Sequence, residues 1–103
     1  MRYAVACNGL VIASRFVECT SYMCYTVRRG LVVNGHNIPV LDGSLENLPS
    51  FFREIDIDAI VVGAIDEGVC AMLESHGFMV IAGQSGDPLT AVRSHVGHIS
   101  RAE

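Results

Sequence analysis

The sequence predicts an α/β fold, built as three layers around a mixed five-stranded sheet. Two apolar runs, "DAIVVGA" at residues 58–64 and "FMVIAG" at residues 78–83, have the continuity of strands that are buried on both faces. Each run leads into a helix-like segment, and a helix between successive buried strands gives a right-handed parallel crossover. The turn Arg28-Arg29-Gly30 instead joins two antiparallel strands.

Three strands are expected in the first part of the chain. Residues 2–6 form a short apolar strand that ends at the turn signal Cys7-Asn8-Gly9. Residues 22–27, rich in β-branched and aromatic types, and residues 31–38 flank the arginine turn. Pro39 ends the later strand because proline cannot donate to the ladder. The stretch 11–19 is ambiguous, since it is short for a helix and broken at Ser14-Arg15.

The first expected helix lies near residues 47–55. Ser44 or Asn47 could cap it, and Pro49 is tolerated only in a first turn. Apolar residues recur at helical spacing and should face the sheet. These are Leu48, Phe51, Phe52 and Ile55.

The two later helices have clear boundaries. Asp66 can cap the helix after residue 64, and His76-Gly77 ends it with a glycine stop. Asp87-Pro88 then supplies a cap and a proline at the first helical position of the last helix. With five strands numbered along the chain, the predicted order across the sheet is 3-2-1-4-5. Strand 2 is antiparallel, and strands 1, 4 and 5 are parallel.

Composition and charge exclude several classes of protein. The chain of 103 residues is 50% hydrophobic, which fits a single domain spanning residues 1–103. The net charge is −4, and the seven basic residues are scattered arginines, so we expect no nucleic-acid partner. No apolar run approaches the roughly 18–20 residues of a membrane span. We therefore expect a cytoplasmic protein whose four cysteines are thiols or ligands.

Three turns should meet at the carboxyl edge of this sheet. They are Cys7-Asn8-Gly9, Gly63-Ala64-Ile65-Asp66 and Gly83-Gln84-Ser85-Gly86. Ligands of open α/β sheets bind in the crevice at that edge, and two helix N-termini there would suit an anion. The alternative is that these are ordinary strand–helix turns, whose amides are already satisfied by the acidic residues at the helix starts.

The sequence resembles the dinitrogenase iron–molybdenum cofactor biosynthesis proteins, small domains with a ribonuclease-H-like fold. The resemblance rests on "YAVACNG" at residues 3–9, "DAIVVGAIDEGVCAML" at 58–73 and "HGFMVIAGQSGDPLTAV" at 76–92, with a loop around Phe16 and Asn37 before a proline. It implies a protein that carries the iron–molybdenum cofactor or its precursor, or a related molybdenum–copper–sulfur cluster. Cofactor-assembly or nitrogenase-related proteins are then the implied partners.

One motif departs from the family. Its loop after the first strand usually reads Ser-x-His-Phe-Gly-Arg, where the histidine is the favoured cluster contact, whereas residues 13–18 here read "ASRFVE". Arg15 replaces the histidine, and only Phe16 survives. Ligation by a histidine at this position is therefore impossible.

The candidate site combines the three turns with the altered loop. Thiolates suit iron, copper and molybdenum–sulfur chemistry, although a lone cysteine is often a buried packing residue. The histidine candidate, His36, could instead be an ordinary exposed residue at the end of a strand. Cargo contacts are expected from Cys7, Asn8, Arg15, Phe16, Gly63, Ala64, Ile65, Gln84, Ser85 and Gly86, and metal ligation from Cys7 and His36.

Three functions remain in competition. The first is a non-catalytic carrier of a metal–sulfur cluster. The second is a structural or regulatory interaction module that has lost its cluster and forms a homodimer through an edge strand. The third is a thiol-based redox protein, ranked lowest because the chain has no Cys-x-x-Cys motif. An enzyme is not expected, because the strand interiors lack the converging carboxylates of two-metal nucleases.

Overall fold

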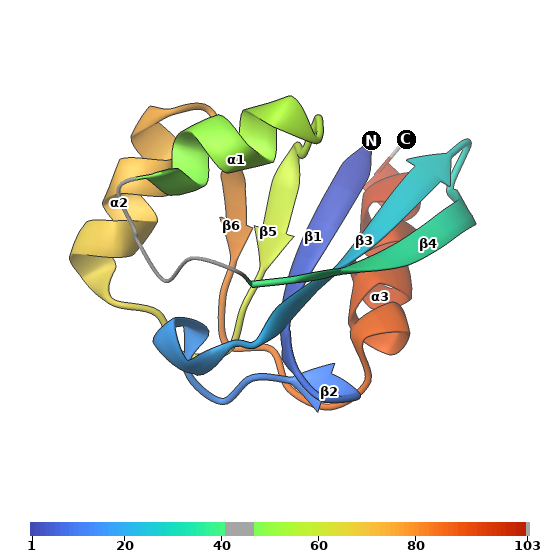
Figure 1. Cartoon of the computed structure of the whole chain (residues 1–103). Coiled ribbons are helices and arrows are strands. Elements are labelled where there is room, and N and C mark those ends of the chain that lie inside the picture. The colour runs from blue at the N-terminus through green and yellow to red at the C-terminus, as the bar shows by residue number, and fades with distance from the viewer. Residues whose placement is uncertain (41–46, 103) are drawn as a thin grey trace.

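A computed structural model describes residues 1–40 and 47–102, and for residues 98–102 it describes the backbone only. Figure 1 shows the elements along the chain. They are β1 (Arg2–Asn8), β2 (Val11–Ile12), the 3₁₀ turn η1 (Phe16–Glu18), β3 (Ser21–Arg28), β4 (Leu31–Pro39), α1 (Leu48–Glu54), β5 (Ala59–Val61), α2 (Glu67–Ser75), β6 (Met79–Ile81) and α3 (Pro88–Ala102).

The sheet is mixed, and its five longer strands follow the order β4-β3-β1-β5-β6. β3 is antiparallel to both β1 and β4, while β1, β5 and β6 are mutually parallel. This is the order predicted for those five strands. The prediction of five strands was wrong, because the chain turns back after β1 and adds the short β2 antiparallel to it. The mixed α/β class is confirmed, and the ribonuclease-H-like assignment stays a prediction.

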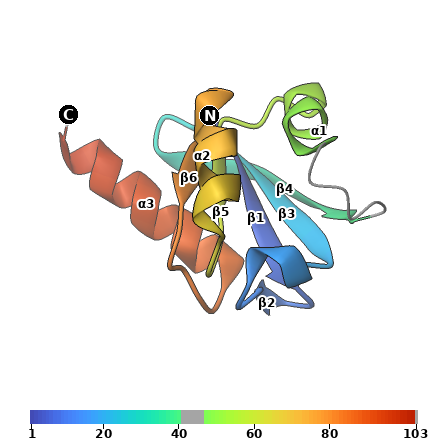
Figure 2. The same ribbon diagram turned by 90° about the vertical axis from the view of Figure 1, so that its left-hand side faces the viewer.

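Helices lie on both faces of the sheet, with α1 and α2 on one face and α3 on the other (Figure 2). Side chains alternate along β1, so Ala4 and Ala6 face α1 and α2, whereas Tyr3, Val5 and Cys7 face α3. On the first face, Phe52 of α1 is fully buried. Three aromatic rings surround it, those of Tyr22, Phe51 and Phe78.

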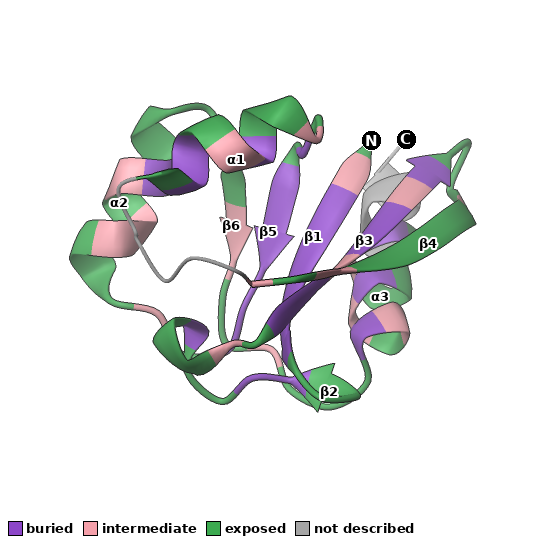
Figure 3. Ribbon diagram, viewed as in Figure 1, coloured by how far each residue is buried: buried purple, intermediate pink, exposed green. Residues whose placement is uncertain are grey.

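The helices cover the sheet less completely at β4 than at its centre. Every residue of β4 is exposed or half-buried, in contrast to β1 and β5 (Figure 3). Within the described part of the chain, α3 is the helix that covers the second face of the sheet (the α3 face), and it packs against Tyr3, Val5 and Cys7 of β1. α3 also lies against part of β4, and most of β3 is buried, so the uncovered part of this face is limited to the area around Met23 and Asn37. This is where the candidate site lies.

The sheet edge at β6 differs from expectation. Residues 78–83 were predicted to form a strand buried on both faces, but β6 spans only Met79–Ile81, and Met79 is 44% exposed. The prediction was wrong because β6 is the edge strand and pairs with β5 alone. By contrast, β5 is fully buried, as its apolar run predicts.

The helix boundaries follow the capping signals in two of three cases. Asp66 caps α2, which ends before Gly77 with φ +91°, and Asp87 precedes α3, which begins at Pro88. The predicted side-chain cap of α1 is absent at Asn47, whereas Ser44 lies outside the described residues. None of the described helices has both the length and the apolar character to cross a bilayer.

Candidate functional site

The three predicted turns are brought together by the segment 11–16, which crosses the carboxyl edge of the sheet. The Ala13 amide donates to the Ala6 carbonyl at 3.0 Å, and the Ala64 amide donates to the Ser14 carbonyl at 2.9 Å. The Ile12 amide reaches the Gly86 carbonyl at 2.9 Å. The ambiguous stretch of the sequence therefore fills part of the expected crevice with the protein's own backbone.

Gly63 shows how closely this segment approaches. A Cβ atom at this position would lie 2.5 Å from the Ala13 carbonyl oxygen and 2.7 Å from that of Ser14. Such distances leave no room for a side chain. The glycine is thus explained by contact with residues 13 and 14, and a ligand need not be invoked for it.

The helix starts at this edge are already capped. The Asp66 carboxylate accepts from the amides of Gly68 at 2.8 Å and Val69 at 3.4 Å. The Asp87 carboxylate accepts from the Thr90 amide and hydroxyl, each at 2.9 Å. These bonds from Thr90 lower the pKa of Asp87, so its carboxylate is charged at neutral pH. The expected anion site at the helix N-termini is therefore occupied by side chains.

The altered loop does not present its two candidate residues to a common ligand. Arg15 is exposed and pairs with Glu18 at 3.2 Å. Phe16 is 2% exposed and packs in the α1/α2 core, its ring 6.4 Å from that of Tyr22. The remaining rim candidates differ in exposure. Asn8, Ala64, Ser85 and Gly86 are exposed, while Ile65 and Gln84 are half-buried.

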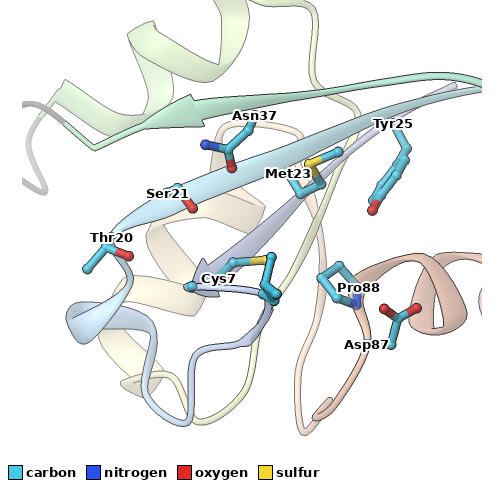
Figure 4. Close-up of a pocket in the computed structure, with 10 residues that line it drawn as sticks. Cys7, Thr20, Ser21, Met23, Tyr25, Asn37, Asp87 and Pro88 are labelled. Carbon is cyan, nitrogen blue, oxygen red and sulfur yellow. The ribbon is translucent and has the colours of Figure 1, made fainter.

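A pocket of about 580 Å³ lies beside this rim, on the open part of the α3 face. The β1–β2 turn, the β3–β4 surface and the start of α3 enclose it (Figure 4). Of the candidates named from sequence, only Cys7 lines it. The full lining is Cys7, Gly9, Leu10, Thr20, Ser21, Met23, Tyr25, Asn37, Asp87 and Pro88.

Sequence reasoning missed most of these residues, although one signal was present. Ser21, Met23 and Tyr25 alternate along β3 and therefore share a face. The β1–β3 register places Cys7 opposite Ser21 and Tyr3 opposite Tyr25, which puts that face on the side of Cys7. Alternation along residues 21–25 is visible in the sequence, but the register that adds Cys7 is not.

The chemical groups of the pocket are mostly neutral at pH 7. Cys7 is 2% exposed, and burial raises the pKa of its thiol, which opposes ionisation. Burial, with a smaller contribution from the nearby Asp87 charge, also raises the pKa of Tyr25. Asp87 is the charged residue among the described lining residues. Soft sulfur groups from Cys7 and Met23 thus share the pocket with hydroxyls and one carboxylate.

The two candidate metal ligands lie on opposite faces of the sheet. His36 is directly opposite Cys24 on β3, and Cys24 faces the α1/α2 core, whereas Cys7 faces α3. Cys7 and His36 therefore cannot coordinate the same ion. Burial raises the pKa of Cys24 to about 11. Across the described residues, no three His, Cys, Asp or Glu side chains lie close enough to hold a metal ion.

Comparison with known proteins shows likeness in fold. No protein-family model and no curated protein matches the sequence. The crystal structure of PH0822 matches with a TM-score of 0.87 and 17% identity, over 95% of this chain and 90% of that one. MJ0327 of Methanocaldococcus jannaschii, named a "putative dinitrogenase", matches in its crystal structure with a TM-score of 0.76 and 14% identity, over 95% and 89%. The NMR structure of MJ0327 matches with a TM-score of 0.74 and 17% identity, over 95% of this chain and 88% of that one.

These likenesses establish a shared mixed α/β fold, and at such identities they establish the fold alone. One fold supports many functions, so the function has to be argued from the site.

Proposed function

We propose that this protein is a non-catalytic carrier of a metal–sulfur cluster, held in the pocket beside Cys7. The cargo would be the iron–molybdenum cofactor, a precursor of it, or a related cluster of molybdenum, copper and sulfur. The observation that carries the proposal is a cysteine thiol that lines an open pocket of about 580 Å³ at the carboxyl end of β1. The likeness in fold to MJ0327 supports this choice of cargo.

The donor set fits a loosely held cargo better than a permanent metal centre. Cys7 and Met23 would supply a thiolate and a thioether, the ligands that soft metals prefer. Structural metal sites commonly use four protein ligands, which the described part of this chain does not assemble. A single anchoring thiolate in an open pocket would allow a cluster to be passed to a partner.

Metal analysis of protein purified without oxygen tests this proposal. We expect bound iron, molybdenum or copper, and a loss of about tenfold or more in Cys7→Ser, because a site with so few ligands depends on its thiolate. Cys70→Ser is the matched control, since Cys70 lies on α2 and outside the pocket lining. It should retain the metal.

Wild-type protein that is metal-free, and that takes up no metal from supplied iron, molybdate and sulfide, would contradict the proposal. Equal metal content in the two serine variants would place any binding away from Cys7.

A second candidate function is a structural or regulatory module that associates through β4. This strand lies at the edge of the sheet, carries no charged residue over Leu31–Pro39, and exposes Leu31 by 67% and Val33 by 54%. Exposed edges are usually protected by charges, prolines or bulges. β4 has a register shift opposite Thr26 and Val27 and ends at Pro39, but it has no charges, and a charge-free edge can pair with another strand. A homodimer formed by antiparallel pairing of two β4 strands is therefore the alternative.

A further inference from the structure

The pocket has a polar wall, formed by Ser21, Tyr25, Asn37 and Asp87, which the carrier proposal leaves unused. Ser21 and Tyr25 are each only 8% exposed. Neither side-chain hydroxyl makes a hydrogen bond to another residue in the part of the chain that the structure describes. Among the described residues, Arg2 Nε is the buried side-chain atom without a partner, so the Ser21 and Tyr25 oxygens are not sealed off and remain accessible from the pocket. They can therefore pair with a ligand in place of water.

The Tyr25 hydroxyl is held in a fixed direction. A Cβ atom on Gly35 would lie 3.0 Å from Cδ1 and Cε1 of the tyrosine, so the ring rests against the backbone of β4 where other residues would carry a side chain. In Figure 4 the hydroxyl points toward the start of α3, where Asp87 lies. The hydroxyl and the carboxylate therefore face the same volume without rearrangement.

The charge of the polar wall is negative. Asp87 is anionic, and both of its bonds from Thr90 end on Oδ2, while the Leu89 amide also interacts with the carboxylate. A carboxylate has about four acceptor positions, so it can still accept from a ligand. The described pocket lining contains no arginine, lysine or histidine. Arg93 on α3 attracts the Asp87 carboxylate but does not line the pocket. An organic anion would gain no ion pair here, whereas a cation would.

We propose that the pocket binds a small organic cation, a ligand with a protonated amine on an apolar body. The ammonium group would donate to the Asp87 carboxylate and the Tyr25 hydroxyl, and the Ser21 hydroxyl would pair with a second polar group. The body would lie against Leu10, Met23 and Pro88. A volume of about 580 Å³ is typical of small-molecule sites. This inference goes beyond the carrier proposal and uses no metal.

Three probes of similar shape and different charge test the inference on metal-free protein by calorimetry at pH 7. They are benzylamine, benzyl alcohol and benzoate. We expect benzylamine to bind about two- to fivefold tighter than the alcohol, the size of a solvent-exposed charge pair, and benzoate to bind more weakly than either. Benzoate binding as tightly as benzylamine, or no binding by any probe, would overturn the proposal.

Two pocket variants and one control variant localise the binding. Asp87→Asn keeps a capping residue and removes the charge, so it should abolish the preference for the amine over the alcohol. Asp66→Asn makes the same change at the start of α2, outside the pocket, and should preserve it. Tyr25→Phe keeps the ring on Gly35 and should weaken benzylamine binding about threefold.

An amine preference that survives in both Asp87→Asn and Tyr25→Phe would overturn the assignment to this pocket. If no amine binds, the carrier proposal is unaffected. If the protein contains and takes up no metal, the amine proposal is unaffected. The two proposals therefore fail separately.

Discussion

At the scale of single residues, Gly63 and Gly97 show what decides whether a glycine is required. The place of a Gly63 side chain is taken by the carbonyl oxygens of Ala13 and Ser14, whereas nothing lies within 4 Å of a Cβ atom on Gly97. The first position is fixed by close backbone approach, and the second, in the exposed part of α3, is not.

Replacement of each glycine by alanine tests this difference. Gly63→Ala should lower the free energy of unfolding by about 1–3 kcal/mol, because residues 13 and 14 must shift to admit the methyl group. Gly97→Ala should raise it by roughly 0.5–1 kcal/mol, since alanine favours the helix. Urea denaturation measures both. Equal effects would show that the backbone of residues 13 and 14 does not constrain position 63.

The Cys7 thiol ionises less readily than that of a redox-active cysteine, whose pKa is lowered. Burial raises the pKa of Cys7, and the pKa of Cys70 is raised by partial burial and its contact with Glu74. The ionised form of each is therefore scarce at neutral pH and grows as the pH rises toward the elevated pKa.

Alkylation by iodoacetamide, followed by mass spectrometry, tests whether the pKa values of the two thiols are raised. We expect both cysteines to react slowly at pH 7, with rates that rise about tenfold per pH unit while the thiol remains mostly protonated. Rapid modification of Cys7 near pH 7, at the rate of an activated thiolate, would contradict the assignment and favour the redox alternative.

At the scale of elements, β4 is the strand whose surroundings are incomplete. It pairs with β3 on one side only, and its exposed apolar residues lie on a strand without charges. Its partner in the sheet, β3, is buried along most of its length. The second functional candidate rests on this difference between neighbouring strands.

Light scattering tests whether β4 pairs with a second copy. If it does, the wild-type protein is a dimer, and Val33→Lys shifts it toward the monomer by placing a charge on the edge. Val17→Lys is the matched control, because Val17 is 57% exposed but lies on η1 rather than on the strand. It should remain dimeric. A wild-type monomer at high concentration would exclude this mode of association.

At the scale of the whole molecule, the order of the five longer strands was readable from sequence. The continuous apolar run of β5 marked a central strand, and the turn at Arg29 and Gly30, both with positive φ, marked the antiparallel pair. These signals are local, and connection rules extend them to topology. The same reasoning overestimated the burial of β6, because an apolar run does not show which strand lies at the edge.

The binding site was less predictable, because it depends on what the fold leaves uncovered. The three turns do meet at one edge, but the segment 11–16 occupies the space between them, and its path follows from long-range hydrogen bonds such as Ala64 to Ser14. The pocket exists because α3 does not cover the part of the sheet around Met23 and Asn37. Neither the path nor the uncovered area is encoded in a local pattern, and only Cys7 belongs to both the predicted site and the observed pocket.

Both proposals require ligands to bind between the β1–β2 turn, β3 and the start of α3. The most direct measurement is the set of backbone amide chemical shifts of the isotope-labelled protein before and after ligand is added, with benzylamine and an anaerobically supplied metal–sulfur cluster as separate ligands. We expect changes centred on Cys7, Ser21, Tyr25 and Asp87. Changes centred instead on His36 or on the exposed rim at Arg15, with the pocket residues unaffected, would contradict this expectation.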